Sequence, residues 1–234
     1  MRRLLITLAI LSTLVCRVYP QREIPQIQPF IDWRMFHLGF HLGFHFQDLI
    51  LTHAGKQSEA GDTWFAEIPS YTPGFTVGII GDMFVNPYLN LRMLPSLHFG
   101  DKQFVFRSQE SGVEYLTTVR SNYLTFPLEL KYSSMRLNNY RPYITAGAYA
   151  AFDLGRKKGE PVLLRSTDYG LTLGIGCDFY FSFFKLCPEL KFYFGLPDLL
   201  EKERPDLPQP DLAVYHDAFG RASSRMIILT FNFE

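Results

Sequence analysis

The feature that most constrains the fold is a strict two-residue alternation of side chains in residues 120–132, RSNYLTFPLELKY. One face carries large apolar side chains, namely Leu124, Phe126, Leu128, Leu130 and Tyr132. The other face carries Tyr123, Thr125, Pro127, Glu129 and Lys131. A period of two is typical of a β-strand whose two faces meet different surroundings. This stretch is therefore predicted to form a strand of roughly ten residues.

The same alternation recurs along the chain. It is strictest in residues 36–46, where large apolar side chains alternate with Gly or His. Pro95 interrupts one of the segments and predicts a bulge or kink there, because proline cannot donate to a sheet ladder. Residues 120–132 and seven further segments are therefore predicted to form eight strands. The seven segments are 36–46, 74–80, 88–99, 141–154, 169–180, 184–195 and 225–233.

The connections between these strands alternate in length. Residues 48–70, 100–119, 155–167 and 197–222 form long polar connections, whereas residues 81–87, 133–140 and 181–183 form short ones. Long loops at one end and short turns at the other are typical of an antiparallel up-and-down meander closed into an outer-membrane barrel. Residues 34–234 are therefore predicted to be an all-β, eight-stranded transmembrane β-barrel, with short periplasmic turns and long extracellular loops.

The N-terminus has the pattern of a signal peptide. Met1-Arg2-Arg3 is basic, and residues 4–15 are an apolar run of signal-peptide length. Residues 1–20 are assigned to the signal peptide, cleaved between residues 16 and 21, and residues 21–33 to a periplasmic lead-in segment. A buried N-terminal helix and a lipidated Cys16 are the alternatives, and the second lacks the small residue expected before the cysteine.

Charge and composition exclude a nucleic-acid partner. The chain has 23 basic and 23 acidic residues, and export would remove Arg2, Arg3 and Arg17, leaving a net charge of −3. No basic stripe exists, and an exported protein does not meet nucleic acid. Cys177 and Cys187 fall on opposite faces of their strands, so two free thiols are predicted.

The main competing fold is a soluble eight-stranded barrel of lipocalin type, in which the apolar face points inward. The other face of residues 170–180 is rich in Gly and Thr, which suits a narrow packed lumen better than a surface in water. We therefore expect these side chains to face lipid: Phe40, Leu42, Phe44, Leu124, Phe126, Leu128, Leu130, Leu173, Ile175, Phe179, Leu229, Phe231 and Phe233. We expect these to face the lumen: His37, His41, His45, Arg92, His98, Glu129, Lys131, Asp178, Glu189 and Lys191.

The lumen histidines are a candidate metal site. His37, His41 and His45 share a face, but residues four apart on a strand lie about 13 Å apart. Zn–N bonds are about 2 Å long, so one ion would need a cross-strand partner such as His98. Hydrogen-bonded structural histidines are the favoured interpretation, and no metal or other cofactor is predicted.

The lumen charges allow two interpretations. They could line a selective channel, or they could fill the lumen as ion pairs. Eight strands leave a lumen just wide enough for side chains to fill, so a non-conducting barrel is favoured. An enzyme of the membrane rim would need Ser and His side chains, and His53, Ser58, His216 and Ser223 have no signature spacing. No catalytic site and no small-molecule substrate are predicted.

The chain resembles a known family. The segments HLGFHLGFHF, SNYLTFPLELKY and RPYITAGAYAAFDLG are similar to those of the outer-membrane β-barrel family of Bacteroidetes. Within it, the similarity is greatest to the PorT group of the type IX secretion system. The resemblance implies an integral outer-membrane protein required for secreting cargo with C-terminal sorting domains, with outer-membrane lipid and other secretion-system proteins as partners. It implies no catalytic residue.

The long connections are the remaining candidates for function. Residues 67–71 and the proline-rich residues 196–212 are predicted to form protein-binding surfaces, because binding residues concentrate in loops held by a rigid scaffold. The sequence thus favours a non-enzymatic accessory of protein secretion in the outer membrane. A structural or adhesion barrel and a lipid-modifying barrel enzyme are the alternatives.

Overall fold

The computed structural model describes residues 25–53, 64–67, 72–108, 114–155, 165–200 and 219–234. The expected signal peptide at 1–20, the lipidation of Cys16 and the start of the lead-in segment lie outside these residues. Within the part of the chain that is described, no helix has the length and apolarity that a transmembrane helix requires.

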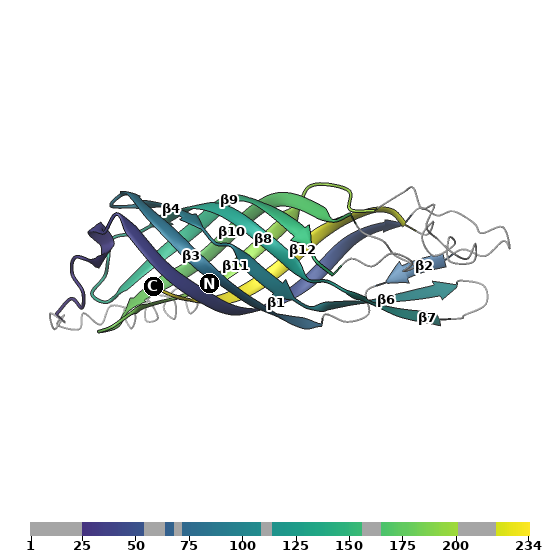
Figure 1. Cartoon of the computed structure of the whole chain (residues 1–234), viewed down its shortest axis with the longest axis horizontal. Helices are drawn as coiled ribbons and strands as arrows, with labels where there is room; N and C mark the ends of the chain where they lie inside the picture. Colours follow the sequence, from purple (N-terminus) through teal and green to yellow (C-terminus); the bar gives the residue numbers. More distant parts are fainter. Residues whose placement is uncertain (1–24, 54–63, 68–71, 109–113, 156–164, 201–218) are drawn as a thin grey trace, which may run out of the picture.

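The chain folds into a closed antiparallel β-barrel (Figure 1). Eight positions in its wall are filled by β1 (Phe36–His53), β3 (Pro73–Asn86), β4 (Leu89–Met93) continued by β5 (Ser96–Phe99), β8 (Tyr123–Ser133), β9 (Tyr140–Asp153), β10 (Thr167–Tyr180), β11 (Lys185–Gly195) and β12 (Phe219–Phe233). Each strand pairs with its neighbour in sequence, and β1 also pairs with β12. The predicted eight-stranded up-and-down barrel is confirmed.

Closure is continuous along β1. Phe40 pairs with Ile79 of β3 on one side and with Phe233 of β12 on the other. A closed barrel satisfies every backbone N–H and C=O within the wall, which the hydrocarbon core of a membrane demands.

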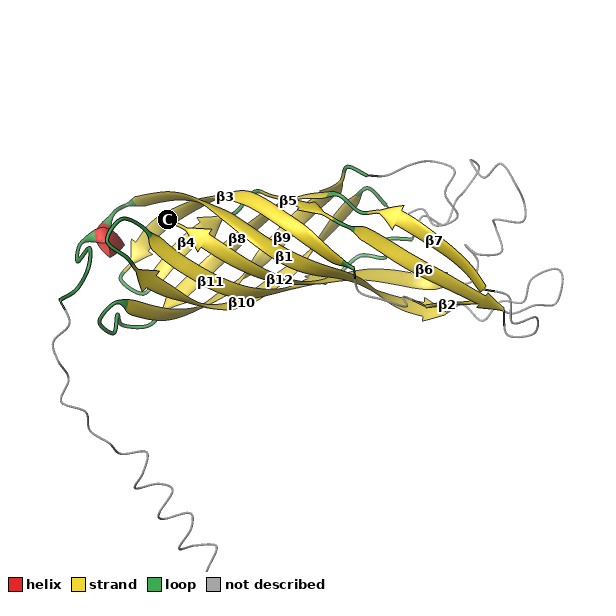
Figure 2. Cartoon of the chain, turned by 90° about the horizontal axis from the view of Figure 1, so that it is seen from below, coloured by secondary structure: helices red, strands yellow, loops and turns green. Residues whose placement is uncertain are grey.

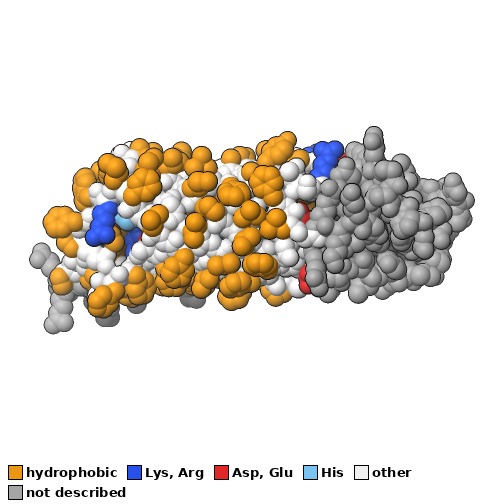
Figure 3. Space-filling model, viewed as in Figure 1, with side chains coloured by type: hydrophobic (Ala, Val, Ile, Leu, Met, Phe, Trp, Pro, Cys, Tyr) orange, Lys and Arg blue, Asp and Glu red, His pale blue; other side chains and the backbone are white. Residues whose placement is uncertain are grey.

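The alternation sorts side chains between the two surfaces of the wall. Along β8 the inward positions are buried and the outward positions are exposed or half-exposed. All thirteen side chains expected to face lipid lie on the outside; Leu124, Phe126 and Phe233 are half-exposed and the others exposed. Hydrophobic side chains cover the visible wall, and charged ones gather towards its two ends (Figure 3).

Pro95 breaks one strand of the wall, as the sequence predicts. β4 ends at Met93 and β5 begins at Ser96. The backbone groups at the break are still used, because Leu94 N–H donates to Pro127 O at 3.2 Å and Ile79 N–H donates to Pro95 O at 3.1 Å. The proline therefore interrupts the strand without opening the wall.

Three of the expected connections are partly wrong. The connection expected at 48–70 contains the end of β1 and β2 (Trp64–Glu67), and the one expected at 100–119 contains β6 (Asp101–Ser108) and most of β7 (Glu114–Arg120). β2, β6 and β7 form a separate three-stranded sheet that projects beyond the barrel (Figures 1 and 2). β12 likewise begins at Phe219, inside the connection expected at 197–222. These segments pair although they lack a continuous apolar face, because the hairpins of the barrel run on past its rim.

The short turns gather at the opposite end, together with the 3₁₀ turn η1 (Ile31–Trp33) (Figure 2). The turn expected at 81–87 is shorter than predicted, because β3 continues to Asn86 through its pairing with β1 and β4. We call this the turn end of the barrel.

A charge placed on the outer wall tests its contact with lipid. Leu173 and Tyr169 are both outward on β10, at 52% and 58% exposure, but Tyr169 lies nearer the rim. We expect Leu173→Arg to lower the free energy of unfolding in lipid vesicles by roughly 2–4 kcal/mol and Tyr169→Arg by about 1 kcal/mol or less. Urea titration of both variants measures the difference, and equal small costs would contradict a lipid-facing wall.

Candidate functional site

The interior of the barrel is polar and almost completely shielded from solvent. The ten polar residues expected in the lumen are all buried there, with exposures of 7% or less, and they are His37, His41, His45, Arg92, His98, Glu129, Lys131, Asp178, Glu189 and Lys191. Every one occupies an inward position of its strand. The lumen is therefore the first candidate for a functional site.

Arg92 on β4 is the centre of the charged network. Its Nη1 lies 3.2 Å from Glu189 Oε2, its Nη2 lies 2.9 Å from Glu234 Oε1, and its Nε lies 3.4 Å from Asp82 Oδ2. β4 and β11 lie on opposite sides of the closed sheet. The Arg92–Glu189 pair thus spans the lumen.

Three lysines complete the network. Lys131 Nζ lies 2.8 Å from both carboxylate oxygens of Asp178. Lys191 Nζ lies 2.7 Å from Glu129 Oε2 and 3.5 Å from Glu189 Oε1. The third lysine is Lys185, whose Nζ lies 2.5 Å from Glu234 Oε2. The Lys131–Asp178 and Lys191–Glu129 pairs join strands that are not neighbours in the wall, so they fill the space between them.

Neutral side chains satisfy the remaining oxygens of Glu189. Tyr143 donates to Oε2 at 3.1 Å, Asn232 donates to Oε2 at 2.9 Å, and Thr145 donates to Oε1 at 2.9 Å. A buried carboxylate is tolerated only when cations and hydrogen-bond donors replace its water. Glu189 therefore has the surroundings that a buried structural carboxylate requires.

The histidines form a separate hydrogen-bonded layer. His45 Nδ1 lies 2.7 Å from Thr76 Oγ1, which lies 2.8 Å from His98 Nδ1. His98 Nε2 in turn lies 3.0 Å from Thr125 Oγ1. The His45 and His98 ring centroids are 5.3 Å apart, edge to face. His98 on β5 thus approaches His45 on β1, as a metal site would need, but the hydroxyl of Thr76 on the intervening strand β3 lies between their ring nitrogens.

The two remaining histidines bond elsewhere. His41 Nε2 lies 3.0 Å from Ser96 Oγ, and His37 Nε2 lies 2.7 Å from the carbonyl of Ile31. Among the described residues, no group of three or more His, Cys, Asp or Glu is arranged to hold a metal ion. The side chains of the lumen histidines thus occupy the interior of the barrel and form hydrogen bonds there.

Glycines on the facing strand make room for these rings. A Cβ on Gly78 would lie 2.4 Å from Pro95 O and 2.5 Å from His41 Cε1. Real Cβ atoms do not come so close to backbone, so only glycine fits at this position of β3. The imidazole ring of His41 therefore packs directly against the backbone of β3 at Gly78.

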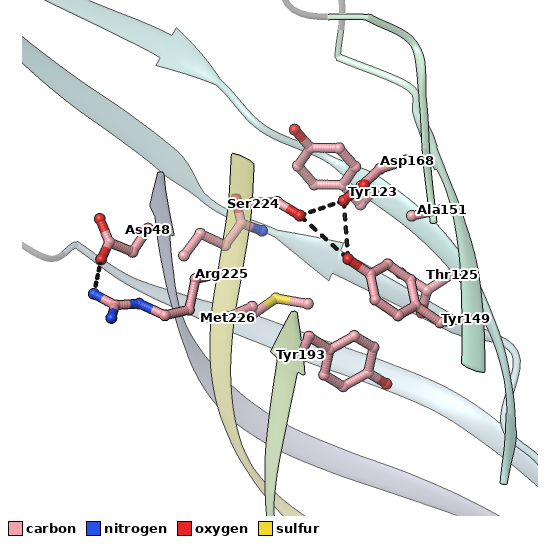
Figure 4. Close-up of a pocket in the computed structure, with 11 residues that line it drawn as sticks. Asp48, Tyr123, Thr125, Tyr149, Ala151, Asp168, Tyr193, Ser224, Arg225 and Met226 are labelled. Atoms are coloured by element: carbon pink, nitrogen blue, oxygen red, sulfur yellow. Dashed lines mark hydrogen bonds and ion pairs between the residues drawn. The ribbon is translucent and has the colours of Figure 1, made fainter. Parts of the chain in front are cut away.

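Aromatic side chains close the lumen towards the rim that bears the long connections. Tyr149 and Tyr193 pack with ring centroids 4.9 Å apart, and the Tyr149 hydroxyl donates to Asp168 at 3.0 Å. Ser224 also donates to Asp168 (Figure 4). A cavity of about 30 Å³ lies among these side chains, room for a few water molecules. A cavity of about 10 Å³ beside His41 and Lys191 lies deeper.

The lead-in segment closes the turn end. Asp32 of η1 accepts from the Tyr180 hydroxyl at 2.7 Å and lies 3.8 Å from Arg136 and 3.6 Å from Arg141. The Arg136 guanidinium lies 3.6 Å from the centroid of the Tyr180 ring and donates to the carbonyls of Ile27 and Gln28. One turn of chain is thereby fixed across this mouth of the barrel.

The residues considered for an enzyme are only partly described. His53 ends β1, and Ser223 lies in β12 opposite Ile50. Ser58 and His216 lie outside the described residues. Of the expected protein-binding loops, Glu67 belongs to β2 and residues 196–200 are described, whereas 68–71 and 201–212 are not.

The two cysteines are free. Cys187 points into the lumen and is fully buried, whereas Cys177 is half-buried on the outer side of β10. The prediction of two free thiols on opposite faces is confirmed.

Sequence reasoning missed several members of the network. Asp82 was assigned to a turn, although it alternates with Gly78 and Ile80 on β3. Lys185 lies near the start of the strand predicted at 184–195, on its inward face, and Glu234 lies one position beyond the strand predicted at 225–233. Extending the alternation to the strand ends would have found them.

A closed barrel of this size, with an apolar outer wall and a packed polar interior, defines an outer-membrane β-barrel protein. Residues 21–201 match the family model described as "Outer membrane protein beta-barrel domain". The chain belongs to this family, and it is a multi-pass barrel of the outer membrane. Among curated proteins, no match was found.

Solved outer-membrane barrels have a similar fold. OprG from Pseudomonas aeruginosa is 11% identical, with a TM-score of 0.47 over 84% of this chain and 92% of that one. Neisserial surface protein A is 9% identical, with a TM-score of 0.42 over 85% and 98%. Ail, the attachment invasion locus protein of Yersinia pestis, is 9% identical, with a TM-score of 0.34 over 84% and 96%. At these values the likeness carries no information on function.

Removing the central cation tests the network. Arg92→Met removes a cation shared by three buried carboxylates and leaves Asp82 without its ion-pair partner. We therefore expect the free energy of unfolding to fall by roughly 3–5 kcal/mol. Arg225→Met is the matched control, because Arg225 pairs with Asp48 where its side chain is 43% exposed, and it should cost about 1 kcal/mol or less. Urea titration in vesicles measures both, and equal costs would contradict a central role for Arg92.

The glycine that faces His41 has its own test. We expect Gly78→Ala to destabilise the barrel, because the new methyl group collides with the backbone of Pro95. Gly81→Ala, three residues along the same strand, meets only Met93 O at 3.9 Å and should be tolerated. The measurement is the temperature at which each variant shifts from the folded to the unfolded band on a gel. Equal temperatures for the two variants would contradict the tight packing.

Proposed function

We propose that this protein is a non-conducting, non-enzymatic outer-membrane barrel that acts as an accessory of protein secretion. The observation that carries the proposal is the layer of ion pairs across the lumen, centred on Arg92 and Glu189. A barrel whose interior is filled in this way offers its partners only its two ends and its outer wall.

The filled lumen supports the absence of conduction. Arg92 and Glu189 have fully buried side chains, and the nearby cavities of about 30 and about 10 Å³ hold only a few waters. The lead-in segment crosses the turn end below them. An ion would have to displace several buried pairs, each of which costs roughly 3–5 kcal/mol to break.

The type IX assignment rests on the sequence resemblance to the PorT group, which covers the mature chain. In this proposal, the barrel assists the export of proteins with C-terminal sorting domains and binds other secretion-system proteins. The projecting sheet of β2, β6 and β7 is the natural contact surface on the outside, because it extends past the rim on a rigid scaffold (Figure 2).

A structural or adhesion barrel is the second candidate. The same projecting sheet favours it, because a surface that extends beyond the rim is also suited to contacts outside the cell. The two candidates differ in whether secretion depends on the protein.

Gene deletion separates them. We expect deletion to leave proteins with C-terminal sorting domains inside the cell, and the wild-type gene to restore their surface display. A chain in which residues 101–120 are replaced by a short turn keeps the barrel strands and should fail to restore display. Normal surface display in the deletion strain would contradict the secretion role and support the structural alternative.

Conduction has a direct test. We expect the purified barrel to insert into planar lipid bilayers without producing stable current steps, because the ion pairs leave no continuous water path. Circular dichroism of the same preparation in vesicles serves as the control for folding. Reproducible single-channel steps from the pure folded protein would overturn the non-conducting proposal.

A further inference from the structure

The apolar outer surface of the barrel does not stop at the first strand. Phe36 and Leu38 at the start of β1 are 61% and 79% exposed. Ahead of them, Phe30 and Trp33 of the lead-in segment are 78% and 64% exposed, and Met35, which follows that segment, is 74% exposed. Large apolar side chains thus continue from the lipid-facing wall onto a segment outside the barrel.

This segment is held firmly in one orientation. Its polar side faces the barrel, where Asp32 bonds to Tyr180 and the Ile27 N–H donates to Asn139 Oδ1 at 2.9 Å. Its apolar side faces outward, with the Trp33 ring 6.0 Å from that of Phe84. The exposure of Phe30 and Trp33 is therefore fixed by contacts on the other side of the segment.

A groove lies between the lead-in segment and the turn that joins β10 to β11. It measures about 480 Å³ and is lined by Gln28, Pro29, Phe30, Ile31, Arg34, Phe183 and Glu234. Phe183, at the tip of the turn, is 95% exposed. Phe30 and Phe183 give the groove an apolar rim.

The cation in the groove is available to a ligand. Within the described part of the chain, the Arg34 guanidinium makes no hydrogen bond or ion pair. The acidic groups nearby are engaged, because Asp32 pairs with Arg136 and Arg141, and Glu234 pairs with Arg92 and Lys185. The turns at 87–88, 134–139 and 181–184 contain no acidic residue. Positive charge is therefore in excess at this mouth of the barrel.

We propose that this groove binds the headgroup of a phospholipid in the leaflet at the turn end, with Arg34 contacting the phosphate. In barrels of this class the turn end faces the periplasm, so the leaflet is the inner one of the outer membrane. Arginine binds phosphate through paired N–H donors, and aromatic side chains settle at the level of the headgroups. The lead-in segment is then an interfacial anchor, and this role is independent of any part in secretion.

Lipid is the occupant favoured by continuity with the lipid-facing wall and by the excess positive charge. A periplasmic protein or a second copy of the chain would also cover apolar side chains, but either would leave Trp33 away from acyl chains. The position of Trp33 therefore decides between lipid and protein.

Trp33 can report this position itself. The chain has two tryptophans, and Trp64 lies in β2 at the opposite end, so Trp64→Phe leaves Trp33 as the only one. In vesicles of brominated phosphatidylcholine we expect the Trp33 emission to fall at least twofold relative to unbrominated vesicles, with little quenching by aqueous acrylamide. Strong acrylamide quenching without bromine quenching would overturn the anchor.

The phosphate contact needs a second measurement. Native mass spectrometry of the barrel, released from phosphatidylglycerol-containing vesicles, counts the lipids retained. We expect Arg34→Gln to reduce the retained phosphatidylglycerol about fivefold, and Arg225→Gln, at the other end of the wall, to leave it unchanged. Equal retention by Arg34→Gln and wild type would overturn the phosphate site, even where Trp33 contacts lipid.

Discussion

The rest of the structure depends on the pairing of Arg92 with carboxylates across the lumen. The outer wall has to be apolar because it meets hydrocarbon, so the polar side chains of every strand are turned inward. Eight strands leave too little space for those groups to keep bulk water. Each buried charge therefore has to find its partner inside, and the partners of Arg92 come from β3, β11 and the residue after β12.

This constraint explains where function can lie. A lumen filled by paired charges is costly to open, since removing one partner leaves a buried charge without full compensation. The ends of the barrel carry no such restriction. One end extends into the projecting sheet, and the lead-in segment lies at the other (Figure 1). The aromatic side chains of that segment are exposed. Both ends are surfaces held by a rigid scaffold, which is the usual setting for binding.

The alternation of side chains was enough to predict the barrel, the two faces of its wall and the burial of Arg92, Glu129 and Glu189. It could not predict which charges pair, because Lys131 and Asp178 meet only through the curvature of the closed sheet. It also missed the contacts that hold the lead-in segment against the barrel, since Asp32 accepts a hydrogen bond from a tyrosine 148 residues further along the chain. The projecting sheet was not predicted, because its strands pair as continuations of the barrel hairpins and show no apolar face in the sequence.

The reactivity of Cys187 tests the central claim most directly. Its thiol is fully buried in the lumen between Lys185 and Glu189 on the inward face of β11. In the mature Cys177→Ser variant, reconstituted in vesicles, a charged methanethiosulfonate reagent can reach it only through the lumen. The account predicts that Cys187 stays unmodified for hours in the folded barrel and reacts once urea unfolds it. Modification within minutes in the folded, vesicle-embedded protein would show that the lumen is open.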